Sequence, residues 1–140
     1  MSAGAGIEHS EFNASKTEPV HLLQIWILPE RKGLQPSYEQ KHFAATERAG
    51  KFRLVASRDG REGSVAAHQD IAMYAALLNA GERAEMALAK DRSAWVHVAS
   101  GNVTMNGQTL TGGDSAAIEQ ETLVTFSAQD AAEILWFDLP

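Results

Sequence analysis

Two residues near the start of the chain have the side chains and the spacing of metal ligands. His9 and Glu11 lie two positions apart in the stretch GIEHSEFN. On an extended segment, residues i and i+2 point to the same face, so the imidazole and the carboxylate would stand side by side. Such a pair suits a divalent first-row metal such as iron, nickel, copper or zinc. Protein metal sites usually have three or four ligands, so the pair predicts only half a site.

The same two residues have a second interpretation, which is an incidental His-x-Glu in a solvated N-terminal segment. Spacing alone leaves both interpretations open. Other kinds of site find less support in the sequence. The serines lack the residues that surround a nucleophile elbow. The glycines of SAGAGIE are not followed by Lys-Ser or Lys-Thr, so this stretch does not predict a phosphate-binding loop.

The composition is that of a globular protein with one domain. The chain has 140 residues, of which 44% are hydrophobic and 21% charged, and a formal net charge of −6. Its basic residues form no stripe, which argues against direct contact with nucleic acid or with an anionic membrane surface. It has no cysteine, so disulfides and thiolate metal sites are excluded. The N-terminus does not resemble a signal peptide and LLQIWIL is too short to cross a bilayer, so we expect a cytoplasmic protein.

Short strands separated by turn residues are predicted for most of the chain. The strongest local signal is Asn106-Gly107, which favours a type I′ turn between two β-prone triplets. The stretch AGERAEMALAKDR has helix propensity, but its alternation also fits a strand, and the neighbouring strands favour the strand. The predicted strands are residues 52–57, 64–68, 71–78, 84–88, 93–100, 103–105, 108–110, 116–120, 122–126 and 133–139.

The N-terminal third follows a different pattern. HLLQIWIL, residues 21–28, is rich in branched and aromatic residues and predicts a strand that ends before Pro29. Residues 30–50 are polar and contain breakers, so they predict a linker with one short helix around residues 37–48. Strands with turns at this spacing predict an all-β sandwich or barrel.

Several of these stretches together resemble the pirin and pirin-like quercetinase branch of the cupins. Gly6, His9 and Asn13 fit the second cupin motif, Gly-x2-His-x3-Asn, and the pirin form of this motif places a glutamate where Glu11 stands. The resemblance continues through HLLQIWILPE, KFRLVASRDGREGSVAAHQDIAMYAALL, WVHVASGNVTMNG and ILWFDLP. It implies an all-β cupin fold, a double-stranded β-helix or jelly-roll barrel, at residues 36–140. Residues 1–35 would form an N-terminal strand arm that resembles the end of a preceding cupin.

Pirin-like proteins are bicupins, so the resemblance implies that this chain corresponds to the C-terminal part. Their N-terminal cupin holds iron or another divalent metal with a His-x-His pair and a later His and Glu. His9 and Glu11 match the later pair. The remaining histidines are His21, His42, His68 and His97, and no two of them are separated by one residue. We therefore expect a half-site with no metal or other cofactor of its own, unless another chain completes it.

The second cupin is expected to lack metal and to be filled by apolar side chains. The region between Gly81 and Gly101 contains a single histidine, His97, and no histidine follows the Gly113-Asp114 turn. His97 alternates with Trp95 in an apolar strand, which favours a structural histidine over a ligand.

Three functions remain open at this point. The first is a non-catalytic interaction or structural module. The second is a metal-dependent, quercetinase-like dioxygenase whose site is completed by oligomerisation, with Glu11 as ligand and base. The third is a metal-free barrel that binds a small molecule. HLLQIWIL is apolar on both faces, so both faces need to be buried against other parts of the protein. We therefore expect a homodimer, with exchanged N-terminal arms as one form of it.

Overall fold

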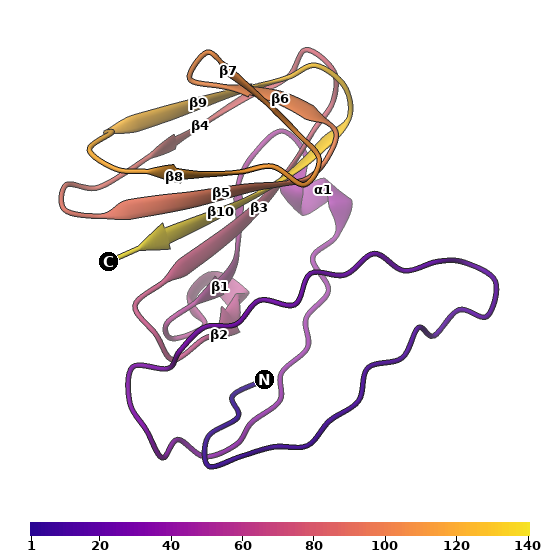
Figure 1. The fold of residues 1–140 in the computed structure, drawn as a ribbon, viewed down its shortest axis with the longest axis vertical. Coiled ribbons are helices and arrows are strands. Elements are labelled where there is room, and N and C mark those ends of the chain that lie inside the picture. Colours follow the sequence, from indigo (N-terminus) through magenta and orange to yellow (C-terminus); the bar gives the residue numbers. More distant parts are fainter.

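The computed structural model describes residues 1–140 and contains ten strands in two sheets (Figure 1). The six-stranded sheet has the order β2-β1-β3-β10-β5-β8, and the four-stranded sheet has the order β4-β9-β6-β7. The strands are β1 (Arg53–Ser57), β2 (Val65–Ala66), β3 (Ala72–Leu78), β4 (Arg83–Ala87), β5 (Ser93–Ser100), β6 (Asn102–Met105), β7 (Gln108–Thr111), β8 (Ser115–Ile118), β9 (Leu123–Ala128) and β10 (Ala132–Leu139). Two short helices accompany them, α1 (Ala45–Arg48) and η1 (Arg61–Gly63).

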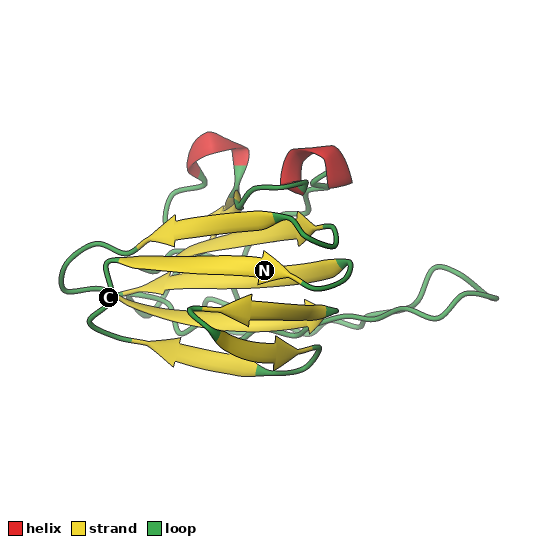
Figure 2. Cartoon of the chain, turned by 90° about the horizontal axis from the view of Figure 1, so that it is seen from above, coloured by secondary structure: helices red, strands yellow, loops and turns green.

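The two sheets pack face to face, which confirms the predicted all-β fold (Figure 2). Alternation along the strands decides which side chains enter the core. On β5, Ala94, Val96 and Val98 are buried, while Trp95 and His97 between them point outward. The strand at Arg83–Ala87 confirms the choice of strand over helix for this Ala- and Glu-rich stretch.

The predicted hairpin between β6 and β7 is confirmed. Asn106 and Gly107 have φ angles of 45° and 84°, as a type I′ turn requires. Thr104 on β6 then pairs with Thr109 on β7. The following turn is closed by Asp114, which accepts hydrogen bonds from the backbone N–H and the hydroxyl of Thr111. These bonds lower the pKa of Asp114, so the carboxylate form that makes them is favoured.

The interior is filled with apolar side chains, as the sequence predicted. Three aromatic residues form its centre, where the rings of Phe126 and Trp136 lie 6.3 Å apart in an edge-to-face arrangement and Phe52 contacts both. Valines and isoleucines from both sheets surround these rings. The fully buried ones are Val96, Val98, Val103, Val124 and Ile134.

The N-terminal arm, residues 1–35, does not contain the strand predicted at residues 21–28. These residues are extended, but residues 23–27 lie over the outer face of β5 and β10 and none of residues 21–28 makes a backbone hydrogen bond to a strand, so no strand forms. The predicted helix is also shorter than expected, because it comprises only Ala45–Arg48. A long two-limbed loop of the arm projects away from the sheets (Figures 1 and 2). The division into residues 1–35 and 36–140 stays a prediction.

Neither α1 nor η1 has the length or the apolar character needed to span a membrane.

Candidate functional site

The structure brings the two predicted metal ligands close together. His9 Nε2 lies 3.6 Å from Glu11 Oε1, and the side chains are 37% and 49% exposed. Both residues belong to the extended first part of the arm, and Ser10 separates them as the i, i+2 argument requires. The pair could therefore present one nitrogen and one oxygen donor to the same ion.

A single copy of the chain does not offer a complete metal site at this position. No group of three or more histidine, cysteine, aspartate or glutamate side chains comes together anywhere in the structure. Two donors are fewer than the three or four that hold a metal firmly in proteins. The residues present thus do not fit a resident metal within one chain.

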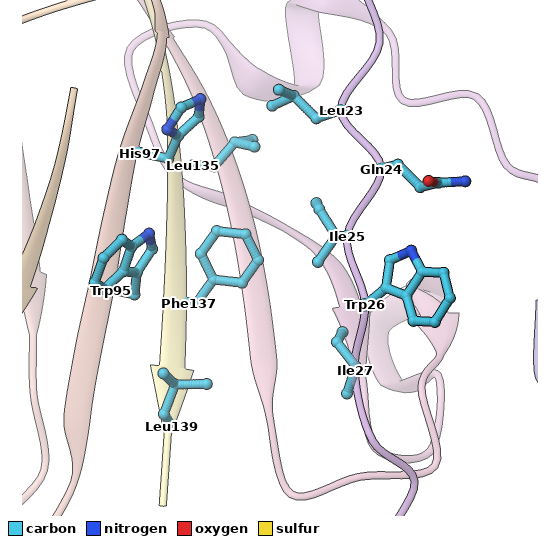
Figure 3. A pocket seen from close by; sticks show the side chains of 10 residues that line it. All are labelled: Leu23, Gln24, Ile25, Trp26, Ile27, Trp95, His97, Leu135, Phe137 and Leu139. Carbon is cyan, nitrogen blue, oxygen red and sulfur yellow. The ribbon is translucent and has the colours of Figure 1, made fainter. Parts of the chain in front are cut away.

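A different concave surface lies on the outside of the six-stranded sheet. It is a groove of about 390 Å³ between residues 23–27 of the arm and the outward faces of β5 and β10 (Figure 3). Eight of its ten lining residues are hydrophobic. Sequence reasoning did not find this groove, although the apolar residues on both faces of SAWVHVAS and EILWFDL were its signal.

The sheet wall of the groove is built by strand register. Phe137 on β10 pairs directly with Trp95 on β5, and Leu135 pairs with His97. Side chains of directly opposite residues share a face of the sheet. Consequently two aromatic rings, one imidazole and Leu135 form one continuous outward surface.

The opposite wall comes from the arm. Leu23, Ile25 and Ile27 point toward the sheet, whereas Gln24 and Trp26 point away from it (Figure 3). This alternation is the period-2 pattern of an extended segment. Residues 23–27 therefore contact the barrel through one apolar face only.

His97 is the single histidine in the groove. Its Nδ1 lies 2.8 Å from the hydroxyl oxygen of Ser115 on the neighbouring strand β8. This contact fixes the ring and agrees with the structural histidine that the sequence favoured. It also leaves Nε2 as the ring nitrogen that is available to another molecule.

The loop at residues 68–70 fastens the end of the arm. The carbonyl oxygen of His68 accepts a hydrogen bond from the backbone N–H of Glu30, and the side chain of Gln69 donates to the carbonyl oxygen of Leu28. Arg58 adds an ion pair of 2.6 Å to Glu30. This His-Gln-Asp stretch therefore tethers the end of the arm to the body of the protein.

Next to this tether, Asp70 takes part in a second cluster of charges. Arg92 pairs with Asp70 and Asp138, which joins the turn before β5 to the end of β10. The hydrogen bond to Asp138 raises the pKa of Arg92, and the bond to Asp70 adds to this effect. These ion pairs hold the end of β10, one of the two strands that form the sheet wall of the groove.

The fold and the groove define a protein of the cupin class, with a jelly-roll barrel and an N-terminal arm on its outer face. Residues 54–139 match the family model described as the quercetinase C-terminal cupin domain, and residues 1–27 match the pirin model. The chain belongs to this family of pirin-like quercetinases.

Known relatives agree with this assignment. The chain is 46% identical to the quercetin 2,3-dioxygenase of Escherichia coli (strain K12) over 140 residues, which are 100% of this chain and 59% of that protein. It is 38% identical to a pirin-like protein of Caulobacter vibrioides, covering 99% of this chain and 60% of the other. The chain thus spans less than two thirds of the length of the curated relatives it matches.

Two solved structures are similar as well. The crystal structure of YhhW from Escherichia coli superposes with a TM-score of 0.77 at 39% identity, and the match covers 82% of this chain and 48% of that one. A crystal structure of the bacterial pirin YhhW in complex with nickel(II) gives a TM-score of 0.75 over the same shares of the two chains.

Proposed function

We propose that this chain is a pirin-like cupin module that acts by binding another polypeptide rather than by catalysis. The observation that carries this proposal is the position of its exposed apolar side chains. Eleven of the thirteen exposed large hydrophobic residues lie in the first 38 residues, and the other two are Trp95 and Leu123. Such a concentration of apolar surface marks interaction sites on proteins.

The backbone of the arm supports the same function. Residues 7–28 make no hydrogen bond between backbone groups, either with each other or with the sheets. Side chains bond some backbone groups of residues 15–18 and the carbonyl oxygen of Leu28, but the backbone groups of residues 20–27 are free. An extended segment with free N–H and C=O groups can pair with a strand of another chain. The face of the arm that points away from the sheet carries Trp26, which is 87% exposed.

We propose a second copy of the chain as the partner, with the arms exchanged or paired. Trp26 and Phe12 can each bury about 150–250 Å². Val20, Leu22 and Leu28, which are also exposed, add further apolar area. These residues together approach the roughly 500 Å² per chain that the smallest specific interfaces require.

The oligomeric state in solution tests this proposal. We expect a dimer at micromolar concentration by sedimentation velocity or light scattering. Trp26→Glu should weaken the dimer by about thirtyfold or more, since a central tryptophan typically contributes at least ~2 kcal/mol. Leu123→Glu is the matched control, because Leu123 is exposed on β9 of the other sheet. A wild-type monomer at micromolar concentration, or a Trp26→Glu variant as dimeric as Leu123→Glu, would contradict the proposal.

A second candidate is a metal-dependent dioxygenase whose site two chains complete. The observation in its favour is the 3.6 Å approach of His9 and Glu11, which leaves both side chains accessible. The similar protein crystallised with nickel(II) makes this candidate worth a measurement. Two copies would have to bring their His9–Glu11 pairs within a few ångströms of each other to supply four donors.

The metal content of the purified protein tests the second candidate function directly. After exposure to ferrous iron or nickel, we expect about one ion per two chains in the purified protein if the four-donor site forms. His9→Ala and Glu11→Ala should each abolish this metal, while His42→Ala, at an exposed histidine outside the pair, should retain it. Equal metal in all four proteins would show that the pair holds no ion.

A further inference from the structure

The groove beside the arm is open to solvent, because its two walls do not bury each other. Trp95 on the sheet side is 44% exposed, and Ile25 on the arm side is 41% exposed, although the two surfaces face each other. The space between them, about 390 Å³, falls in the range of pockets that bind small molecules. The barrel interior, by contrast, is packed with the rings of Phe126, Phe52 and Trp136.

The shape of the groove favours a flat molecule. The paired side chains of Trp95 and Phe137 make one wall aromatic, and Ile25 and Ile27 make the other wall aliphatic. A planar ring system placed between them would contact the aromatic wall with one face and the arm with the other. Binding would also release the water that otherwise contacts the apolar walls, which favours the bound state.

The polar groups of the groove limit the chemistry of the ligand further. No charged residue is among those that line it, so it offers nothing to neutralise a phosphate or a carboxylate. His97 is held at Nδ1 by Ser115, which leaves Nε2 for a hydrogen bond. A hydroxyl group can both donate and accept, so it suits Nε2 in either tautomer of the ring.

From these observations we infer that the groove between residues 23–27 and the outer face of β5 and β10 binds a neutral, planar aromatic molecule that carries a hydroxyl group. Trp95 and Phe137 contact the ring system, and His97 Nε2 bonds the hydroxyl. This site lies on the outer face of the barrel and not in its packed interior. It lies on the face of the arm opposite the one toward which the Trp26 side chain points, where the dimer surface is proposed (Figure 3).

Calorimetric titration with 2-naphthol tests the site, and naphthalene is the matched probe without the hydroxyl. We expect 2-naphthol to bind more tightly than naphthalene. His97→Phe should lower the affinity for 2-naphthol by roughly five- to tenfold, the typical effect of one hydrogen bond, and leave naphthalene unchanged. Trp95→Ala should weaken both probes by roughly tenfold, because it removes the aromatic wall.

Leu123→Ala is the control, since it removes a hydrophobic side chain of similar exposure, 45% against 44% for Trp95, from β9 of the other sheet. It should leave the binding of both probes unchanged. The inference is wrong if 2-naphthol does not bind at millimolar concentration, or if Leu123→Ala weakens its binding as much as Trp95→Ala does. It is also wrong if binding disappears as the protein concentration rises, because a second copy would then fill the groove. Failure of the dimer proposal alone would leave the results of these titrations unaffected.

Discussion

Replacing Trp136 with alanine is expected to lower the free energy of unfolding by about 3–5 kcal/mol, the usual range for the loss of a buried aromatic side chain. Trp136 has no exposed surface and lies on β10 between β3 and β5, where it pairs with Tyr74 and Val96. The cavity would open at the centre of the aromatic cluster, where the sheets cannot easily collapse around it. Chemical denaturation followed by far-UV circular dichroism measures the loss.

Trp136→Phe is the matched control for this prediction. The indole N–H of Trp136 is buried and has no hydrogen-bond partner, so the aromatic replacement removes an unpaired donor as well as some volume. An unpaired buried donor typically costs about 1–3 kcal/mol, which offsets part of the lost packing. We therefore expect Trp136→Phe to be much less destabilising than Trp136→Ala. Equal losses would contradict this prediction, because they would mean that the phenylalanine ring recovers none of the packing.

The second large effect is expected at Gly101, in the tight turn between β5 and β6. Gly101 has a φ of +80°, and a Cβ atom there would lie 2.7 Å from the Cα of Ala132 and closer still to the carbonyl oxygen of Ala131. Neither backbone atom can move without disturbing β10, the strand that forms the wall of the groove. Gly101→Ala should therefore cost about 3 kcal/mol or more, from backbone strain and steric overlap together.

Gly107→Ala separates these two causes. Gly107 has a similar φ of +84°, but nothing lies within 4 Å of the position that its Cβ would take. This variant should cost only the strain of the left-handed conformation, about 1–2 kcal/mol. The difference between the two variants in thermal or urea unfolding measures the overlap at Gly101. A difference near zero would contradict the close approach of Ala131 and Ala132.

Both predictions concern the scaffold that positions the groove, so they bear on function. Trp95 and Phe137 stand on the strands whose inner faces hold Val96 and Trp136. A loss of packing inside the sheet is expected to disturb the rings outside it, since the two faces belong to the same strands. The proposed dimer surface on the arm should be less sensitive, because the hydrogen bonds that hold this end of the arm are made to the loop of residues 68–70.

The sequence alone determined the features that depend on neighbours along the chain. The strand pattern follows from alternation with period 2, and the hairpin at Asn106-Gly107 follows from the φ angles that these residues tolerate. The proximity of His9 and Glu11 also follows from two positions on one extended segment. The spacing of strands and turns predicted an all-β fold, and the family motifs specified a cupin and gave the absence of a His-x-His pair its meaning.

Only the tertiary structure decided the features that join distant segments. The groove combines Ile25 with Trp95 and Phe137, and no spacing in the sequence relates these three positions. The expectation of a strand at residues 21–28 was wrong for the same reason, since a ladder needs a free edge as well as β-prone residues. The tether at His68 and Gln69 likewise arises from the path of the chain. Local propensity fixes backbone shape, whereas long-range packing decides which faces meet, and the groove of this protein lies where two such faces meet.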